Sequence, residues 1–184
     1  MASKPSSEFL EVPFVAEHLS RAARQAGRCA EVNASEAFRA LLHANSRAFD
    51  SPLEVAYWLW WSVATEGIPT LGDFVLDGHV RVPSSDDSYY VLDFVVDYFN
   101  EYRGDDDIVR KRWPRIAIEL DGHAFHEKTL EQVTRRNQRD RDLQRLGWKV
   151  FHYSFDEFSS DPWSAVTEPL LYAVGIVSEL RKAA

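Results

Sequence analysis

Residues 115–126, with the sequence RIAIELDGHAFH, constrain the fold more than any other segment. Apolar and polar side chains alternate along it, which is the pattern of a β-strand. Glu119 and Asp121 therefore share one face of this strand, directly before Gly122. Two neighbouring carboxylates cannot both be buried in ionised form without a cation between them. The segment predicts either a divalent-metal site at a strand end or an edge strand whose polar face is wet.

A second segment, residues 89–99 with the sequence YYVLDFVVDYF, also alternates as a strand does. This alternation predicts Leu92, Phe94 and Val96 on one face and Asp93 on the other. A lone Asp in a central strand costs free energy unless it is paired or binds a metal, and both alternatives stay open. If the two segments pair antiparallel, Asp93 lies on the face that carries the two carboxylates of the first segment.

The order of elements predicts an α/β domain with a mixed sheet of about four strands flanked by helices. An Asp77-Gly78 pair predicts a hairpin turn between two short strand pieces. Gly147 is placed to end a long helix. We expect helices at residues 15–25, 35–47, 51–65, 128–146 and 165–182, and strands at 74–76, 79–82, 89–99, 115–121 and 148–153.

The chain divides at about residue 50. Residues 1–50 are predicted to form a tail and an N-terminal helical extension, and residues 51–184 to form the α/β domain. The extension carries no recognisable chemistry. We expect it to pack beside the core or to contact a partner, including a second copy of the chain in a homodimer or larger complex.

The helix over residues 128–146 carries polar groups on its inward arc as well as outside it. Its apolar positions Val133, Leu143 and Leu146 define that arc. One interpretation is a solvated basic face with an Arg139–carboxylate ion pair inside. The other places Gln132 and Arg136 near the acidic site, with outer arginines touching phosphate. The inward set is Gln132, Arg136, Arg139 and Asp140, and the outward set is Arg135, Gln138, Arg141 and Arg145.

Glu54 is the polar exception in an otherwise apolar helix that begins at Ser51-Pro52. A helix that is apolar on every side is predicted to be buried. Ser51 and Glu54 have the spacing of a capping box, in which each side chain satisfies a backbone N–H at the start of the helix. The alternative is a carboxylate held near a functional site, and spacing does not separate the two.

The net charge of −8 argues against a nucleic-acid surface over the whole chain, but a local basic patch occurs at residues 135–145. Cys29 is the single cysteine, so the chain cannot form an internal disulfide, which fits a reducing cytoplasm. The start of the sequence lacks the apolar run of a signal peptide, and no segment has the length of a membrane span. We therefore expect a cytoplasmic protein with no membrane partner.

Two motifs, ELDGHAFHEKT and RDRDLQRLGWKV with Asp161-Pro162 beyond them, give the chain a family resemblance. It resembles the restriction-endonuclease-like PD-(D/E)xK superfamily. Within that superfamily it is similar to small bacterial endonuclease-domain proteins related to very-short-patch-repair (Vsr-like) endonucleases. The shared pattern is E-x-D-G, a following His, a basic helix with RD-x-x-L-x-x-x-G, and a strand. It covers roughly residues 51–171.

This resemblance implies hydrolysis of DNA phosphodiester bonds with Mg²⁺ or Mn²⁺. The metal ligands and catalytic acids would be Asp93, Glu119 and Asp121. Further catalytic roles would fall to Glu54, which matches a helical Glu near the metal, to His126 or His123 in proton transfer, and to Lys128 or Lys149 as the positive group. DNA would be bound by Gln132, Arg135, Arg136, Arg139 and Arg141.

Several positions depart from the family pattern. Asp121 stands where the general superfamily has Lys, although the similar subfamily also has Asp there. Arg136 replaces an acidic residue that usually lies three positions before the RD pair, and Leu92 replaces a basic residue. Two other functions therefore stay open: a catalytically weak nuclease fold that binds DNA or a partner, and an interaction protein without nucleic acid.

Overall fold

The computed structural model describes residues 4–5, 9, 12–29, 48–66, 74–84, 88–98, 114–122 and 130–183. These residues belong to two compact units. The helical unit comprises Met1–Pro69 and Asp156–Thr167, and the sheet unit comprises Thr70–Phe155 and Glu168–Ala184. The helix predicted at residues 35–47 lies outside the described residues.

The helical unit contains α1 (Pro13–Cys29), α3 (Pro52–Glu66), most of α5 (Phe155–Ser160) and the start of α6 (Pro162–Ala183), together with the two-residue strands β1 (Lys4–Pro5) and β2 (Ala48–Phe49). α3 is buried along nearly its whole length, as its apolar sequence predicts. The Tyr57 hydroxyl donates to the backbone oxygen of Ala165 at 3.1 Å, which ties α3 to α6. Asp161 starts α6 by accepting a hydrogen bond from the backbone N–H of Ser164.

His18 of α1 lies at the centre of the helical unit. Its side chain is only 1% exposed. Its Nδ1 accepts a hydrogen bond from Trp60 Nε1 at 3.0 Å, and its ring stacks on Phe158. Burial, and next the nearby charge of Arg21, lowers the pKa of His18 to about 4, because both disfavour the imidazolium. His18 is therefore a neutral core residue that accepts a hydrogen bond.

The sheet unit contains one mixed sheet of four strands in the order β3-β4-β5-β6. β3, β4 and β5 pair antiparallel, whereas β5 and β6 pair parallel and are joined through the crossover helix α4. The bounds are β3 Phe74–Pro83, β4 Tyr89–Tyr98, β5 Ile116–Asp121, α4 Leu130–Arg145 and β6 Lys149–Ser154. This arrangement confirms the predicted α/β class and the mixed sheet of four strands flanked by helices.

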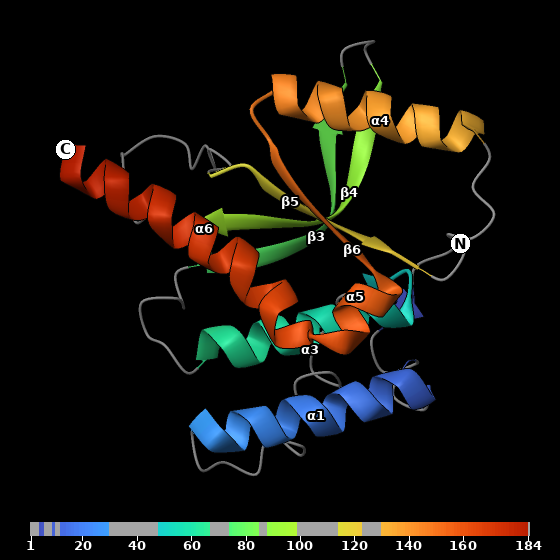
Figure 1. Ribbon diagram of the computed structural model, residues 1–184, viewed down its shortest axis with the longest axis vertical. Coiled ribbons are helices and arrows are strands. Elements are labelled where there is room, and N and C mark those ends of the chain that lie inside the picture. Colours follow the sequence, from blue (N-terminus) through green and yellow to red (C-terminus); the bar gives the residue numbers. More distant parts are fainter. Residues whose placement is uncertain are drawn as a thin grey trace. The chain divides into compact units, whose positions relative to one another are not determined.

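α4 lies along one side of this sheet (Figure 1). The contact is made by one buried apolar cluster, whose members are Val80, Val82, Leu92, Val95, Ala117, Leu143 and Trp148. Leu143 is the helix residue of this cluster, whereas Val133 and Leu146 are 39% and 38% exposed. The buried apolar arc of α4 is thus narrower than the arc predicted from its sequence, because polar side chains make the remaining contacts with the sheet.

The hairpin turn predicted at Asp77-Gly78 is wrong, because β3 continues through both residues. The turn lies later, where Ser84 N–H donates to the Ser88 oxygen at 3.1 Å. Gly78 lies opposite Phe94 in the ladder, and a Cβ added to it would lie 3.5 Å from the Phe94 ring. Pairing with β4 over nine residue pairs outweighs the local turn preference of these two residues.

β3 and β4 both shift their side-chain alternation at the same level of the sheet. Leu92 and Val95 belong to one core cluster although a regular strand would place them on opposite faces. Ladder pairs join Gly78 to Phe94 and Val80 to Leu92, and the intervening His79 has a φ of 52°. The predicted face of Leu92 is therefore wrong, because the chain bends in both strands beside Asp93.

None of the helices within the described ranges is long and apolar enough to cross a membrane.

Candidate functional site

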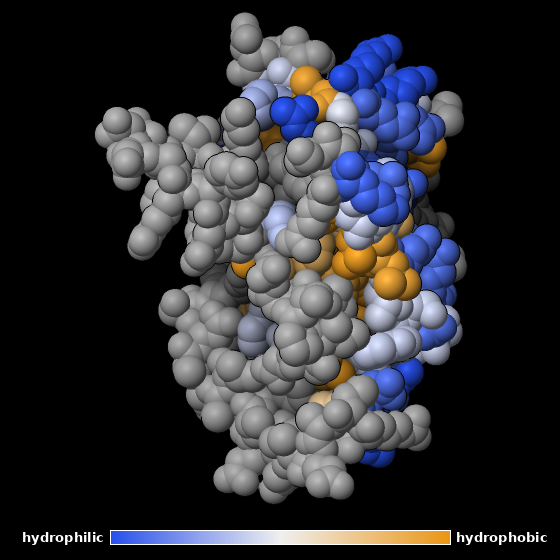
Figure 2. Space-filling model, turned by 90° about the vertical axis from the view of Figure 1, so that its left-hand side faces the viewer, coloured by the Kyte–Doolittle hydropathy of each residue, from blue (hydrophilic) through white to orange (hydrophobic). Residues whose placement is uncertain are grey.

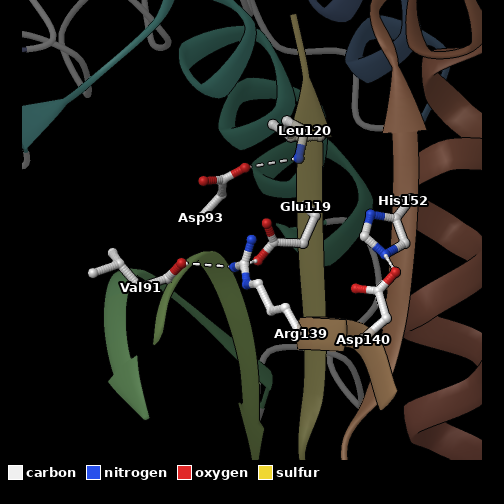
Figure 3. Close-up of polar contacts among 7 residues, drawn as sticks. All are labelled: Val91, Asp93, Glu119, Leu120, Arg139, Asp140 and His152. Carbon is white, nitrogen blue, oxygen red and sulfur yellow. Dashed lines mark hydrogen bonds and ion pairs between the residues drawn. The ribbon is translucent and has the colours of Figure 1, made fainter. Parts of the chain in front are cut away.

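The candidate site lies where β4 and β5 separate. Their pairing runs from Val96 opposite Ile116 to Phe94 opposite Ile118. Beyond it, side chains replace the ladder hydrogen bonds. Asp93 Oδ2 accepts from Leu120 N–H at 2.8 Å, and the Val91 oxygen accepts from Arg139 Nη2 at 2.8 Å. Figure 3 shows both contacts in the space between the two strands.

Glu119 of β5 is the buried acid of the site, with 7% of the residue exposed. Its Oε1 accepts a hydrogen bond from Arg139 Nη2 at 2.6 Å. Burial, and next the negative charge of Asp93, raises the pKa of Glu119 to about 8, although Arg139 acts in the opposite direction. The sheet thus holds Glu119 where its negative charge costs free energy despite an arginine partner.

Asp121 completes the acidic group at the end of β5. Its Oδ2 lies 2.7 Å from Arg136 Nη1, in a pair more exposed than that of Glu119 and Arg139. The charge of Asp121 also contributes to the raised pKa of Glu119. The structure thus brings Asp93, Glu119 and Asp121 close together. Glu119 and Asp121 lie on the side of the sheet that faces α4, as the alternation of β5 predicts, and Asp93 lies in the space between β4 and β5 (Figure 3).

Arg136 and Arg139 lie one helical turn apart on α4 and point toward the sheet. They are partly buried, whereas Arg135 and Arg141 are exposed. This difference agrees with the inward and outward sets read from the periodicity of the sequence. Figure 2 shows strongly hydrophilic surface at the height of α4 in Figure 1. One helix therefore carries both the internal partners of the carboxylates and an outward basic face.

Two polar contacts near the site were not found from the sequence. His152 of β6 lies opposite Glu119 in the parallel ladder, and its Nε2 lies 3.2 Å from Asp140 Oδ2 (Figure 3). Burial lowers the pKa of His152, although Asp140 opposes the shift. Asp142 is 4% exposed and accepts a hydrogen bond from the Tyr90 hydroxyl at 3.0 Å. The parallel register of β5 and β6 is needed to find the first contact, and a single sequence does not supply it.

These contacts give a physical role to the RD pair of the basic helix. Arg139 bonds to β4 and β5, and Asp140 contacts β6. Consecutive residues of α4 are thereby attached to three neighbouring strands. The pair fixes the helix over the end of the sheet at which the carboxylates lie.

Glu54 belongs to the helical unit and forms the predicted cap of α3. Its N–H donates to Ser51 Oγ at 3.2 Å. Its carboxylate accepts from Ser51 Oγ at 2.9 Å and from the backbone N–H of Asp50 at 3.0 Å. The second backbone partner is thus Asp50 instead of Ser51. These bonds account for a carboxylate that is 5% exposed in an apolar helix.

Three of the candidate residues, His123, His126 and Lys128, lie outside the described residues. Gln132 belongs to α4, but its side chain is also outside the description. Within the described ranges, no three His, Cys, Asp or Glu side chains are already arranged as a metal site. Instead, guanidinium groups contact two of the three carboxylates.

Comparison of the chain with protein-family models, with curated proteins and with solved structures found no match.

Proposed function

We propose that this chain is a metal-dependent DNA endonuclease of the restriction-endonuclease-like PD-(D/E)xK type, similar to Vsr-like endonucleases and acting in the cytoplasm. The observation that supports the proposal most is the convergence of Asp93, Glu119 and Asp121 where two strands separate. A carboxylate whose pKa is raised to about 8 by burial and by a second carboxylate lies where added positive charge would be stabilising.

The donor set fits a hard divalent cation. Mg²⁺ and Mn²⁺ prefer oxygen ligands, and the three side chains supply carboxylate oxygens from two adjacent strands. Asp93, Glu119 and Asp121 would hold the cation. When bound, Mg²⁺ or Mn²⁺ would polarise the scissile phosphate and lower the pKa of a water molecule.

The remaining work falls to other side chains. Arg135 and Arg141 are exposed on α4 and would contact the phosphate backbone. Gln132, Arg136 and Arg139 belong to the same helix and would extend this contact toward the acidic site. His126 would exchange a proton with the attacking water or the leaving oxygen, and Lys128 would stabilise the developing negative charge.

The test is nicking of supercoiled plasmid with and without Mg²⁺ or Mn²⁺. We expect nicking only when metal is present. The nicking rate should fall about a hundredfold or more in Asp93→Asn, because loss of a residue that merely supports a metal ligand can already cost that much activity. Asn retains an oxygen that can accept from Leu120 N–H, so the fold should persist. Asp97→Asn in the same strand is the matched control and should keep its activity. Equal nicking by Asp93→Asn would contradict the proposal.

A second function is favoured by one observation. Because Arg136 and Arg139 already contact two of the carboxyl groups, the site can persist as a structural element in a nuclease fold that binds DNA without cutting it. Salt-dependent DNA binding without nicking in either metal would favour this function. Absence of both activities would exclude both functions.

The DNA surface has its own expected result. Reversing the charge of Arg135 and Arg141 together to Glu should weaken DNA binding whatever the sequence of the duplex. It should also reduce the slope of log affinity against log salt by roughly two, because two phosphate contacts are lost. Fluorescence anisotropy of a labelled duplex at several salt concentrations measures both quantities. Arg24→Glu with Lys182→Glu, two exposed positions elsewhere, gives the same change in net charge and should retain the slope.

A further inference from the structure

Two arginines of one helix each bind one carboxylate of the E-x-D segment. Arg139 Nη2 lies 2.6 Å from Glu119 Oε1, and Arg136 Nη1 lies 2.7 Å from Asp121 Oδ2. Arg139 also donates to the Val91 oxygen at 2.8 Å. The residues are three positions apart, which places both guanidinium groups on the same side of α4. Figure 3 shows the Arg139 guanidinium beside Glu119 at the space between the strands.

The charges of this group favour a divalent cation that replaces the two guanidinium groups over one that binds beside them. Asp93, Glu119 and Asp121 carry three negative charges when ionised, and the two guanidinium groups carry the positive charge of one divalent cation. A cation added beside both arginines would give a site with an excess of positive charge. The cost of such an excess is large where Glu119 is only 7% exposed.

We infer that Arg136 and Arg139 are internal counter-ions of the acidic site, and that a divalent cation binds by displacing them from Asp121 and Glu119. The inference rests on the proposed function and assigns a further role to α4 in it. The affinity of the site for metal then depends on the difference between two free energies, that of the carboxylates binding the metal and that of the same carboxylates binding the guanidinium groups. The displaced guanidinium groups stay on the helix whose outer arginines face solvent, and guanidinium binds phosphate well.

The experiment is a calorimetric titration of the full chain with Mn²⁺ at fixed ionic strength. Arg136→Gln and Arg139→Gln each remove one competing cation, so each should bind Mn²⁺ about tenfold more tightly than the wild type. Arg135→Gln removes the same charge from the exposed face of the same helix and should change the affinity little. Arg136→Lys retains a cation and should behave nearly as the wild type.

Failure of this inference differs from failure of the proposed function. If Asp93→Asn loses Mn²⁺ binding but Arg136→Gln and Arg139→Gln bind no more tightly than the wild type, the arginines are not displaced and the metal site stands. If folded wild type and all folded variants bind no Mn²⁺, the proposed metal site itself is wrong. Should Arg139→Gln fail to fold because Glu119 loses its buried partner, Arg136→Gln decides the question at the more exposed pair.

Discussion

Glu119 should make the metal-free protein less stable as the pH rises from 4.5 to about 8, because over this range the unfolded chain gives up the Glu119 proton and the folded chain keeps it. In the folded chain Glu119 holds the proton to about pH 8, whereas in the unfolded chain it loses it near 4.5. Unfolding therefore releases a proton within this range, and higher pH favours it. The contribution of Glu119 to the free energy of unfolding should fall by up to about 5 kcal/mol, a large share of the stability of an ordinary domain.

Urea denaturation in the presence of a chelator, at several pH values across this range, measures the effect. Glu119→Gln should remove the loss of stability between pH 6.5 and about 8, because Gln cannot ionise. At the alkaline end of the range the variant should be more stable than the wild type. At the acidic end, where the wild-type Glu119 is protonated, the variant should lose this advantage. The range from pH 6.5 to about 8 is decisive, because the titration of His18 opposes that of Glu119 only below it. A wild-type stability that does not fall in this range would show that Glu119 is not held as a buried acid.

The second expected result concerns the helical unit, which should lose stability as the pH falls. His18 has its pKa lowered to about 4 from an ordinary value of 6.5. As the pH falls through this range, the unfolded chain takes up a proton that the folded chain refuses, so stability is lost. The loss should reach about 3 kcal/mol at the acidic end, because the imidazole is buried against Phe158 and bonded to Trp60.

The change to test is His18→Gln. Its amide oxygen can still accept the hydrogen bond from Trp60 Nε1, but it does not titrate. We expect the variant to lose some stability at neutral pH through poorer packing, and to lose less than the wild type on acidification. Tryptophan fluorescence during urea denaturation reports the transition. An acid-induced loss as large as that of the wild type would place the titrating group elsewhere.

Sequence periodicity predicted the parts of the site that depend on one element at a time. Alternation along residues 115–121 places Glu119 and Asp121 on one face of a strand, and helical spacing separates inward Arg136 from outward Arg135. The Ser51–Glu54 spacing predicts the cap that the structure contains. In each case a local period or spacing fixes the direction of the side chain, so no knowledge of the tertiary fold is required.

The features that the sequence did not predict depend on pairing between distant segments. Asp77-Gly78 has the composition of a turn, but the ladder with β4 keeps it extended. The φ of 52° at His79 could not be predicted from the sequence, because histidine adopts positive φ more often than most residues but does not require it. The contact of His152 with Asp140 follows only once β6 is placed parallel to β5.

The hydrogen bond from Leu120 N–H to Asp93 has a consequence for solvent exchange. In a regular sheet, the protection of an amide from deuterium reflects the opening of the ladder. At Leu120 it reflects instead the position of one carboxylate side chain on the neighbouring strand. If Asp93 turns toward another partner, this amide loses its acceptor while the pairs from Phe94 to Val96 stay intact. The exchange rate of a single backbone proton therefore measures the orientation of Asp93 without any assay of cleavage.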